Sequence, residues 1–449
     1  MVTVSPRRWL ILPLETKTRE LHGKMLLGLV AAERGWGVVI GSKSALRNVQ
    51  AYLPRGMFFE KGVTPSMTAG LELSRSRGHR VAALCEEGLL YFATDEYLHV
   101  PSVDYLDYLF TWGTRQAADV HAVMVRNHEK IVVSGNPRLD LVRPEWRGVF
   151  ARAAARIRER YGRIILVNTK FPTVNHVVRS IGDYTDYLKS YGKVTTVEQE
   201  ALWRRYVAFQ GAVFPFMLEL LPALSREFAE HTILVRPHPS ENNTPWIEKA
   251  KGLPNVEVVD QGNVLEWIMA ADVVVHSNCV TGVEASLLGT PTVAYRPFKD
   301  EAVEFELPRD VGLEAATEEE MILTIRSLLS GDGGLREKAL RPPAVAGEYI
   351  ANAYGRLASE VIADTIAGLD LPAAEANFPI RPKGTAGVVA RLKSLSPVKS
   401  VLTYNRKKFP PLDLGEMERL RADFQGVSGR FADIQVTQVT DDGFCVYKP

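Results

Sequence analysis

Short apolar runs alternate with amphipathic segments over roughly the first 140 residues of the chain. Runs rich in β-branched and aromatic residues predict strands at residues 9–14, 37–41, 57–59, 80–84, 108–112 and 131–133. Helical periodicity fills several of the intervals, including residues 20–33, which end before Gly35, and residues 65–75, which end before Gly78. Alternation of this kind predicts a parallel sheet with helices on both faces.

A second alternating series begins at residue 163. It predicts strands at residues 163–167, 232–235, 256–259, 273–275 and 292–295, with helices at 264–271 and 282–288. Residues 142–160 are interpreted as a linker that passes into a helix, and residues 171–198 as an insertion that overhangs a cleft. Two such halves predict ligand binding in a crevice outside the carboxyl ends of the strands. The expected domains are residues 1–145 and 146–365, followed by an extension over 366–449.

The composition is that of a folded protein, and its net charge is too small to create a strong electrostatic field. Hydrophobic residues make up 46% of the 449 residues and charged residues 24%, and the formal net charge of +1 argues against nucleic acid as a partner. Cys85, Cys279 and Cys445 show neither disulfide nor metal-ligand spacing, so a reducing interior fits best. The first residues make a poor signal peptide, and no apolar run approaches the roughly 20 residues needed to cross a bilayer. A cytoplasmic location is therefore expected.

The last part of the chain has a different character. Residues 377–412 carry eight basic residues and no acidic residue before Asp413, with apolar residues between them. Such a segment is a plausible anchor on an anionic membrane surface, which would place the protein on the inner face of the inner membrane. The alternative is a helix that packs back on the first domain with its lysines in water.

The first motif with chemical content is "RPHP", which follows an apolar strand. Proline fixes its own φ and restricts the residue before it, so His238 sits on a stiffened loop directly after Arg236. An imidazole held in this way is expected to point at a ligand, and Arg236 and His238 are both candidates for binding a nucleotide. A histidine in an ordinary turn is the alternative.

The second motif lies in "VVVHSNCVTGVEASLL", where a strand, a turn and a helix follow one another. Thr281 and Glu284 match a capping box, a structural role that needs no ligand. The same helix start offers free backbone N–H groups and a positive dipole end to a phosphate, and Ser277 and Asn278 add polar donors. Gly282 would let a ligand approach the backbone. Glu284 could instead accept hydrogen bonds from the two hydroxyls of a ribose.

The two motifs lie about forty residues apart, each at the carboxyl end of a predicted strand of one sheet. Together they predict a cradle for a nucleotide monophosphate or diphosphate. Their pairing resembles bacterial GT-B glycosyltransferases that use CMP-activated acidic sugars, such as β-Kdo transferases and His-Pro-motif sialyltransferases. The motifs "LPLETKTRELHGK", "EEGL", "VSGNPRLD" and "LVNTKF" are similar to those of the surface carbohydrate biosynthesis protein group. The resemblance implies that His238 and the turn 277–281 hold the CMP phosphate and that Glu284 holds the ribose.

Polar residues also follow the first strand of the second series and one strand of the first. Asn168, Thr169 and Lys170 end the strand in "LVNTKF", and the lysine could pair with a phosphate or a sugar carboxylate. Glu86 and Glu87 end the strand in "AALCEEGLLY", and paired carboxylates can deprotonate an acceptor hydroxyl or attack an anomeric carbon. A polar strand end and solvated glutamates are the alternatives.

The loop after the first strand is crowded with charge. Lys17, Arg19 and His22 are candidates for binding a donor carboxylate or an anionic acceptor, and a solvated helix start is the alternative. The motif "SGNPRLD" is interpreted as a structural turn near the hinge between the domains.

The sequence therefore predicts an α/β protein of GT-B form, with two doubly wound Rossmann-like domains facing a cleft and a C-terminal appendage. The expected activity, by the resemblance, is transfer of a Kdo-type or nonulosonic acid sugar from a CMP donor to a glycan or glycolipid acceptor of the bacterial surface, in lipopolysaccharide or capsule, with no metal or other cofactor. A CDP-glycerol-type polyol-phosphate transferase and a UDP-sugar 2-epimerase are the enzymatic alternatives. An inactive scaffold of a polysaccharide assembly complex is the alternative from another class.

Overall fold

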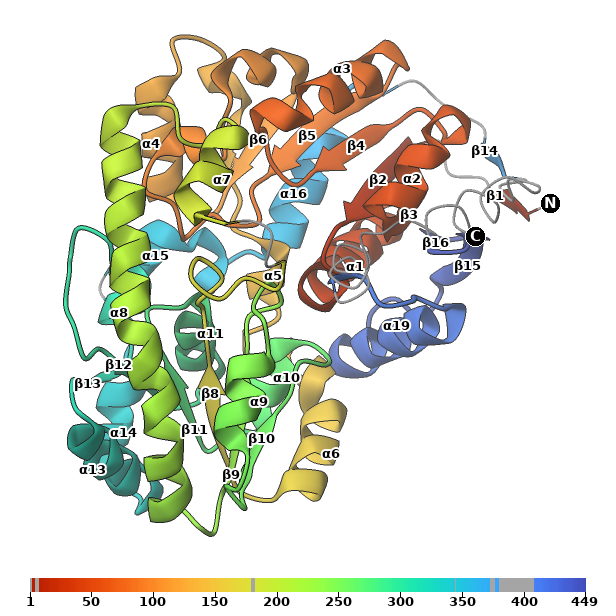
Figure 1. Cartoon of the computed structure of the whole chain (residues 1–449). Helices are drawn as coiled ribbons and strands as arrows, with labels where there is room; N and C mark the ends of the chain where they lie inside the picture. Colours follow the sequence, from red (N-terminus) through yellow and green to blue (C-terminus); the bar gives the residue numbers. More distant parts are fainter. Residues whose placement is uncertain (1, 5–7, 179–181, 344, 372–375, 379–407) are drawn as a thin grey trace, which may run out of the picture. The chain divides into compact units, whose positions relative to one another are not determined.

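The computed structural model describes residues 2–4, 8–178, 182–343, 345–371, 376–378 and 408–449 (Figure 1). The chain forms two compact units. Unit 1 comprises Met1–Gly88, Thr94–Leu141 and Gly347–Pro449, and unit 2 comprises Leu89–Ala93 and Val142–Ala346. The chain therefore passes between the units more than twice, and its last hundred residues return to unit 1.

Unit 1 is built on an eight-stranded sheet of the order β15-β16-β3-β2-β4-β5-β6-β7 within the described residues. The six strands from β2 to β7 are parallel, because helices return the chain to the same edge between them. The C-terminal hairpin of β15 and β16 adds antiparallel to β3. The strands are β2 (Arg8–Leu14), β3 (Trp36–Ser42), β4 (Met57–Glu60), β5 (Arg80–Leu84), β6 (Tyr108–Thr111), β7 (Ile131–Val133), β15 (Gln435–Thr440) and β16 (Gly443–Tyr447).

Helix α1 (Lys17–Glu33) is the central helix of unit 1, and most of its residues are buried. It contacts β2 and β3 on one side and two short helices, α5 (Pro137–Asp140) and α16 (Ala358–Ala367), on the other. Other helices of unit 1 include α2 (Lys43–Asn48), α3 (Thr68–Ser76), α4 (Thr114–Val123) and α19 (Leu414–Ser428). A helix that is apolar nearly all round belongs inside a protein, which explains the length of the run "MLLGLVAA".

Unit 2 is built on a parallel six-stranded sheet of the order β10-β9-β8-β11-β12-β13 within the described residues. Its strands are β8 (Ile164–Asn168), β9 (Thr232–Arg236), β10 (Val256–Val258), β11 (Val273–His276), β12 (Thr292–Tyr295) and β13 (Leu313–Ala315). Its helices include α6 (Ala151–Tyr161), α7 (Tyr184–Ser190), α8 (Val197–Glu227), α9 (Thr244–Ala250), α10 (Val264–Ala270), α11 (Val280–Leu288), α12 (Glu306–Asp310), α13 (Glu318–Leu329) and α14 (Gly333–Leu340). The central strands are fully buried, as in sheets covered on both faces.

Helix α8 is 31 residues long, and the sequence analysis predicted no helix over most of its length. It begins at Val197 with a capping box formed by Thr196 and Gln199, and it continues through Pro215 and Pro222 to Glu227. By length and composition alone it could cross a membrane. One side of it belongs to the core of unit 2, and core helices of soluble proteins can have the same length and composition.

The α/β class is confirmed, with a parallel sheet in unit 2 and a sheet in unit 1 whose strands β2 to β7 are parallel, and most predicted strands lie within one or two residues of the observed ones. Three expectations differ from the structure. Residues 171–198 contain α7 and end in the first turn of α8 rather than forming a separate insertion. The return to unit 1 falls at residue 347 and not near 365. Within the extension, residues 414–447 form α19 and two strands that complete the sheet of unit 1, so this part is no appendage.

Candidate functional site

The carboxyl edge of the sheet in unit 2 collects the predicted nucleotide-binding residues. Strands β8, β9 and β10 follow one another in one direction across the sheet, whereas β11, β12 and β13 follow one another in the other. The order therefore reverses between β8 and β11, and ligands of open α/β sheets bind at such a point. The last residues of three neighbouring strands, Asn168, Arg236 and His276, are in register with one another. The turns that follow these residues therefore begin at the same level of the sheet. The turn after β9 and the turn after β11 are separated by two strand spacings, or about 10 Å.

The side chains of Arg236 and His238, at the turn after β9, have different partners. Arg236 donates to the backbone carbonyls of Gln261 (2.6 Å) and Gly262 (2.7 Å), and its guanidinium lies over the ring of Trp267. Burial lowers the pKa of Arg236 to about 10. In His238, Nδ1 accepts a hydrogen bond from the backbone N–H of Ser240 at 3.1 Å. In the neutral ring the proton then lies on Nε2, which makes that nitrogen a donor. His238 therefore retains the geometry of a ligand-binding group, and Arg236 anchors the loop.

Glu241 holds this turn and the turn after β8 together, and the sequence analysis missed it. Its carboxylate is fully buried and accepts hydrogen bonds from Thr169 Oγ1 (2.7 Å) and from the backbone N–H groups of Phe171 (3.0 Å) and His238 (3.1 Å). It also accepts from Trp246 Nε1 at 3.1 Å. Burial raises the pKa of Glu241, and the hydrogen bonds oppose that shift. Its position three residues after His238 was the available signal.

Lys170 and Asn278 join the turns after β8 and β11. Lys170 is largely buried and donates to the backbone carbonyl of Asn278 at 2.9 Å. The ammonium group of Lys170 also lies 4.5 Å from the ring centre of Phe305 and 5.6 Å from that of Tyr206. Asn278 has a positive φ of 47°, and its side chain bonds the backbone N–H and carbonyl of Phe305, both at 2.8 Å. Asn278 is therefore a structural clamp, whereas Lys170 places a cation at the point where the strand order reverses.

The start of α11 differs from the predicted capping box. The N-cap residue is Cys279, without a side-chain cap, so Thr281 and Glu284 occupy positions inside the helix. The capping-box interpretation is wrong for this reason. Gly282 is needed because the imidazole of His276 packs against it, where an added Cβ would overlap the ring. Glu284 is fully buried, and its role toward a ribose stays a prediction, as does that of Ser277 toward a phosphate.

His276 makes unit 2 sensitive to acid. The ring is fully buried, and burial, with a smaller effect of Lys170, lowers its pKa to about 3 from 6.5. A lowered histidine pKa means that the folded state holds the neutral ring, so stability is present above pH 6.5 and is lost as the pH falls toward 3. We expect His276 to reduce the free energy of unfolding by about 2 kcal/mol between pH 7 and pH 5.

The comparison that measures this effect is urea unfolding of the native protein and of His276→Asn at both pH values. Asparagine retains an acceptor for the backbone N–H of Cys279, which donates to His276 Nδ1, and it does not titrate. The pH dependence of the variant should be smaller by that amount. Equal pH dependence of the two proteins would show that His276 is not buried in its neutral form.

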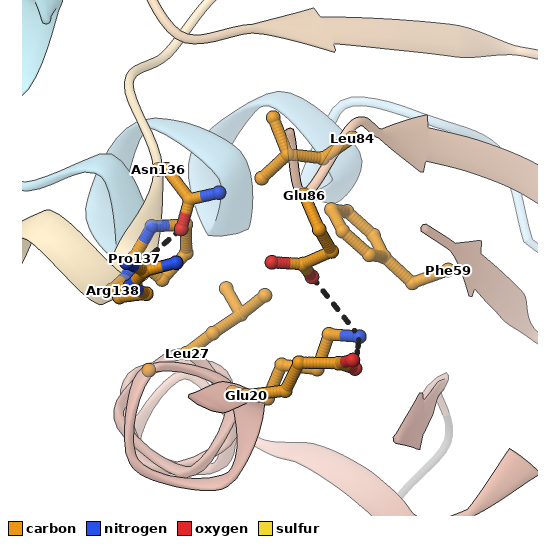
Figure 2. A pocket seen from close by; sticks show the side chains of 10 residues that line it. Glu20, Leu27, Phe59, Leu84, Glu86, Asn136, Pro137 and Arg138 are labelled. Atoms are coloured by element: carbon orange, nitrogen blue, oxygen red, sulfur yellow. Dashed lines mark hydrogen bonds and ion pairs between the residues drawn. The ribbon is translucent and has the colours of Figure 1, made fainter. Parts of the chain in front are cut away.

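In unit 1, the two glutamates after β5 have different environments. The side chain of Glu86 is 13% exposed and forms an ion pair with Lys24 at 3.3 Å (Figure 2). Lys24 also binds Glu20 at 2.9 Å and the backbone carbonyl of Pro13 at 2.8 Å. The side chain of Glu87 is 56% exposed and pairs with Arg19 Nη1 at 2.6 Å. Burial disfavours the charged form of Lys24, but the carboxylates of Glu20 and Glu86 raise its pKa, so the ammonium group stays charged.

A small cavity of about 10 Å³ lies beside the inner cluster and has room for about one water molecule. Its lining includes Glu86 and Lys24 together with Asn136 and Arg138 from the "SGNPRLD" motif (Figure 2). Asn136 Nδ2 is buried there without a hydrogen-bond partner. A cavity of this size holds no sugar or nucleotide. Glu86 is therefore an internal residue, and Glu87 is the carboxylate that a substrate can reach.

The loop after β2 binds the C-terminal part of the chain. Lys17 donates to the backbone carbonyl of Pro411 (2.6 Å) and to Glu416 (2.7 Å), so it is not a solvated helix start. Burial and the nearby charge of Lys17 lower the pKa of His22 to about 4. Arg19 donates hydrogen bonds to the side chain of Glu87 and to the backbone carbonyl of Glu86. Burial lowers the pKa of Arg19, but the two glutamates raise it by more, so the net shift is upward. A substrate role for Lys17, Arg19 and His22 stays a prediction.

The "SGNPRLD" motif has the structural role expected of it. Asn136 caps α5, and its backbone N–H and carbonyl bond the side chain of Asn352 at 3.2 and 3.0 Å. Asp140 is fully buried and accepts hydrogen bonds from Asn352 and from the first N–H groups of α16, those of Ala358 (2.8 Å) and Ser359 (2.9 Å). Burial raises the pKa of Asp140 to about 6. The motif thus holds the segment by which the chain returns to unit 1.

The proposed membrane segment, residues 377–412, lies mostly outside the described residues. In its described end, Lys408 pairs with Glu15 at 3.4 Å and Leu412 is buried. Among the described residues, no group of three or more His, Cys, Asp or Glu side chains could hold a metal ion.

No protein-family model matches the chain, and no curated protein matches it. Among solved structures, a variant of the Wall Teichoic Acid Polymerase TagF is 14% identical with a TM-score of 0.53, over 81% of this chain and 89% of that chain. A TagF variant soaked with CDPG is 12% identical with a TM-score of 0.51, over 81% and 88%. A putative UDP-N-acetylglucosamine 2-epimerase from Listeria monocytogenes is 13% identical with a TM-score of 0.49, over 82% and 99%. The likenesses in fold to the two TagF structures confirm the GT-B fold class.

Proposed function

We propose that the protein is a GT-B transferase that uses a cytidine nucleotide donor and releases CMP. The observation that carries this proposal is the common edge in unit 2 at which Lys170, His238 and the start of α11 follow three strands in register. Each of the three offers positive charge or a hydrogen-bond donor, and the strand order reverses between two of them. The acceptor would be a cell-surface glycan or glycolipid.

Two donors satisfy this proposal. A CMP-activated acidic keto-sugar is supported by the sequence motifs, and a CDP-glycerol-type donor is supported by the likeness in fold to TagF, which was soaked with CDPG. In the first case the acceptor oxygen bonds to the anomeric carbon, and in the second it bonds to the β-phosphorus. CMP departs with the electron pair of the broken bond in both cases. A positively charged phosphate site stabilises the leaving group in either reaction.

The proton of the acceptor hydroxyl needs a base, and Glu87 in unit 1 is our candidate. It is the more exposed of the two glutamates after β5, whereas Glu86 is used in the inner ion pair with Lys24. Glu87 would take this proton as the new bond forms, and CMP would leave as its phosphate dianion. The sequence did not distinguish Glu86 from Glu87. In this proposal Glu87 is the base and Glu86 is the partner of Lys24.

His238→Ala is expected to weaken CMP binding by roughly 10- to 100-fold, because a hydrogen bond to a charged phosphate contributes about 1.5–3 kcal/mol. Thermal-shift titration with CMP, CDP, UDP and GDP measures the preference, and calorimetry gives the Kd. His128→Ala, which removes an exposed histidine of unit 1, is the control and should bind as the native protein does.

The nucleotide series also tests the alternatives. A preference for UDP would contradict the proposal and favour a UDP-sugar 2-epimerase. The absence of any response to the four nucleotides would favour the scaffold. Turnover of CMP-N-acetylneuraminate or of CDP-glycerol, followed by CMP release, would then identify which kind of donor is used.

A further inference from the structure

A row of aromatic side chains in unit 2 begins beside Lys170. The ammonium group of Lys170 lies 4.5 Å from the ring centre of Phe305. From there the row runs through Tyr206, Trp203, Tyr184, Tyr187 and Tyr191, with successive ring centres 6.0, 5.6, 6.2, 5.8 and 4.9 Å apart. It therefore leads from the proposed phosphate site to the first turns of α8 and along α7 (Figure 1).

The row is packed at one end and exposed at the other. At the inner end, Tyr206 is 4% exposed, and the ring of Phe92, which also belongs to unit 2, stacks on Phe305 with centres 4.8 Å apart. At the outer end, Tyr191 is 55% exposed. Partly exposed rings lie between these ends, namely Trp203, Tyr184 and Tyr187. These three and Tyr191, the outer rings, present aromatic surface to a ligand.

The three tyrosines of the outer rings lie on one face of α7, because they are spaced by three and four residues. Thr185 and Leu188 are the buried residues of this helix. Tyr191 buries little area, so its ring contributes little to the stability of the fold. Tyrosine and tryptophan in such positions are typical of binding surfaces, since each joins an apolar ring to a polar group.

Charged side chains on the same two helices form a network of ion pairs. Arg204 bonds Asp186 at 3.0 Å and Glu200 at 2.7 Å, and Lys189 bonds Glu200 at 2.6 Å. Sugars are recognised by this combination of groups. The C–H face of a pyranose packs on an aromatic ring, and its hydroxyls form hydrogen bonds with guanidinium and carboxylate groups.

The balance of charge distinguishes this surface from a membrane contact. Attraction to anionic lipids requires an excess of Lys and Arg near the surface. Here the cations Arg204 and Lys189 are paired with carboxylates of α7 and α8. A neutral ligand that is rich in hydroxyl groups therefore suits the outer rings better than a lipid surface does.

We propose that the outer rings form a glycan-binding surface, on which consecutive pyranose units of an oligosaccharide stack. An oligosaccharide bound along the row would have one end near Lys170. This inference rests on the proposed function in one respect, because the glycan is the acceptor only if Lys170 binds the donor phosphate. Binding of the glycan itself requires residues of unit 2 alone.

The experiment measures binding of three oligosaccharides to the full chain by calorimetry, without nucleotide. The probes are chitopentaose, maltopentaose and a tetramer of α2,8-linked N-acetylneuraminate. At least one should bind, and Tyr187→Ala and Tyr191→Ala should each weaken that binding by roughly 3- to 10-fold, because one stacking contact is lost. Tyr187→Phe and Tyr191→Phe retain the ring and should change the Kd by less than about twofold.

Tyr52→Ala is the matched control, because it removes a tyrosine of unit 1 that is 75% exposed and lies outside the row. Its Kd for the oligosaccharide should equal that of the native protein. The Tm and the Kd for CMP of Tyr191→Ala should also be native, which separates loss of a binding surface from loss of packing.

Three results would overturn the inference. None of the three oligosaccharides binds, or the alanine variants bind as tightly as the native protein. The third is that vesicles of phosphatidylethanolamine and phosphatidylglycerol retain the native protein but not Tyr191→Ala, which would make the outer rings a membrane contact. If an oligosaccharide binds but CMP does not, the proposed function fails and the glycan-binding surface stands. If CMP binds but none of the oligosaccharides does, the glycan-binding surface fails alone.

Discussion

Glu87→Gln is expected to lower the rate of CMP release by roughly 100- to 10,000-fold, the range by which a general base contributes. The amide cannot accept the proton of the acceptor hydroxyl, although its shape is nearly that of the carboxylate. The side chain is exposed, and its pair with Arg19 is at the surface, so the fold should be retained. The affinity for CMP, which depends on unit 2, should not change. Donor turnover and calorimetry with CMP together measure the two effects.

Two further variants distinguish the loss of a base from the loss of an ion pair. Glu33→Gln is the control, because Glu33, like Glu87, is a carboxylate paired with an arginine. Glu33 lies in α1 and pairs with Arg430, and its substitution should leave the rate unchanged. Glu86→Gln disturbs the inner pair with Lys24, so its main effect should be on the Tm. A native rate in Glu87→Gln would exclude this residue as the base. If Glu86→Gln were folded and inactive instead, the assignment of the two glutamates would be reversed.

Glu241→Ala is expected to destabilise unit 2 by about 4 kcal/mol, because several buried donors lose their acceptor at once. The donors belong to the turns that carry His238 and Lys170, namely the backbone N–H groups of His238 and Phe171 and the hydroxyl of Thr169. For a unit of this size, the loss corresponds to a Tm lower by roughly 10 °C. CMP binding should weaken in the fraction that remains folded, since both turns lose their shared support.

Glutamine at the same position gives a graded comparison. Its carbonyl can replace the oxygen that accepts three of the hydrogen bonds, but its amide group then faces the indole N–H of Trp246. Glu241→Gln should therefore cost about 1–3 kcal/mol, less than the alanine variant. Glu219→Ala, an exposed residue paired with Lys249, is the control and should change the Tm little. Equal stability of Glu241→Ala and the native protein would show that Glu241 is not the acceptor for these groups.

The sequence located the functional edge of unit 2 because strand ends are a local property. The apolar run before Arg236 and the prolines around His238 place a turn there without knowledge of the fold, and the same holds for the turn after β11. The pairing of these turns required only the rule that parallel strands end at one edge of a sheet. Register between β9, β8 and β11 then confirmed that they share this edge.

The direction of individual side chains was harder to predict. Arg236 bonds backbone carbonyls, Asn278 clamps Phe305, and Gly282 accommodates His276, although each was expected to serve a ligand. Residues of this kind are equally suited to a ligand and to the protein's own polar groups. Their partners come from segments up to 27 residues away in the chain, so only packing could decide between the two uses.

What the sequence determined by itself is therefore the α/β class, the positions of most strands and the two turns that bracket Lys170. These follow from periodicity and from backbone restrictions that act within a few residues. The tertiary structure decided that Glu241 supports both turns, that Glu87 is exposed while Glu86 is internal, and that Phe92 belongs to unit 2. Exposure and shared hydrogen bonds depend on which distant segments pack together, and no local pattern carries that information.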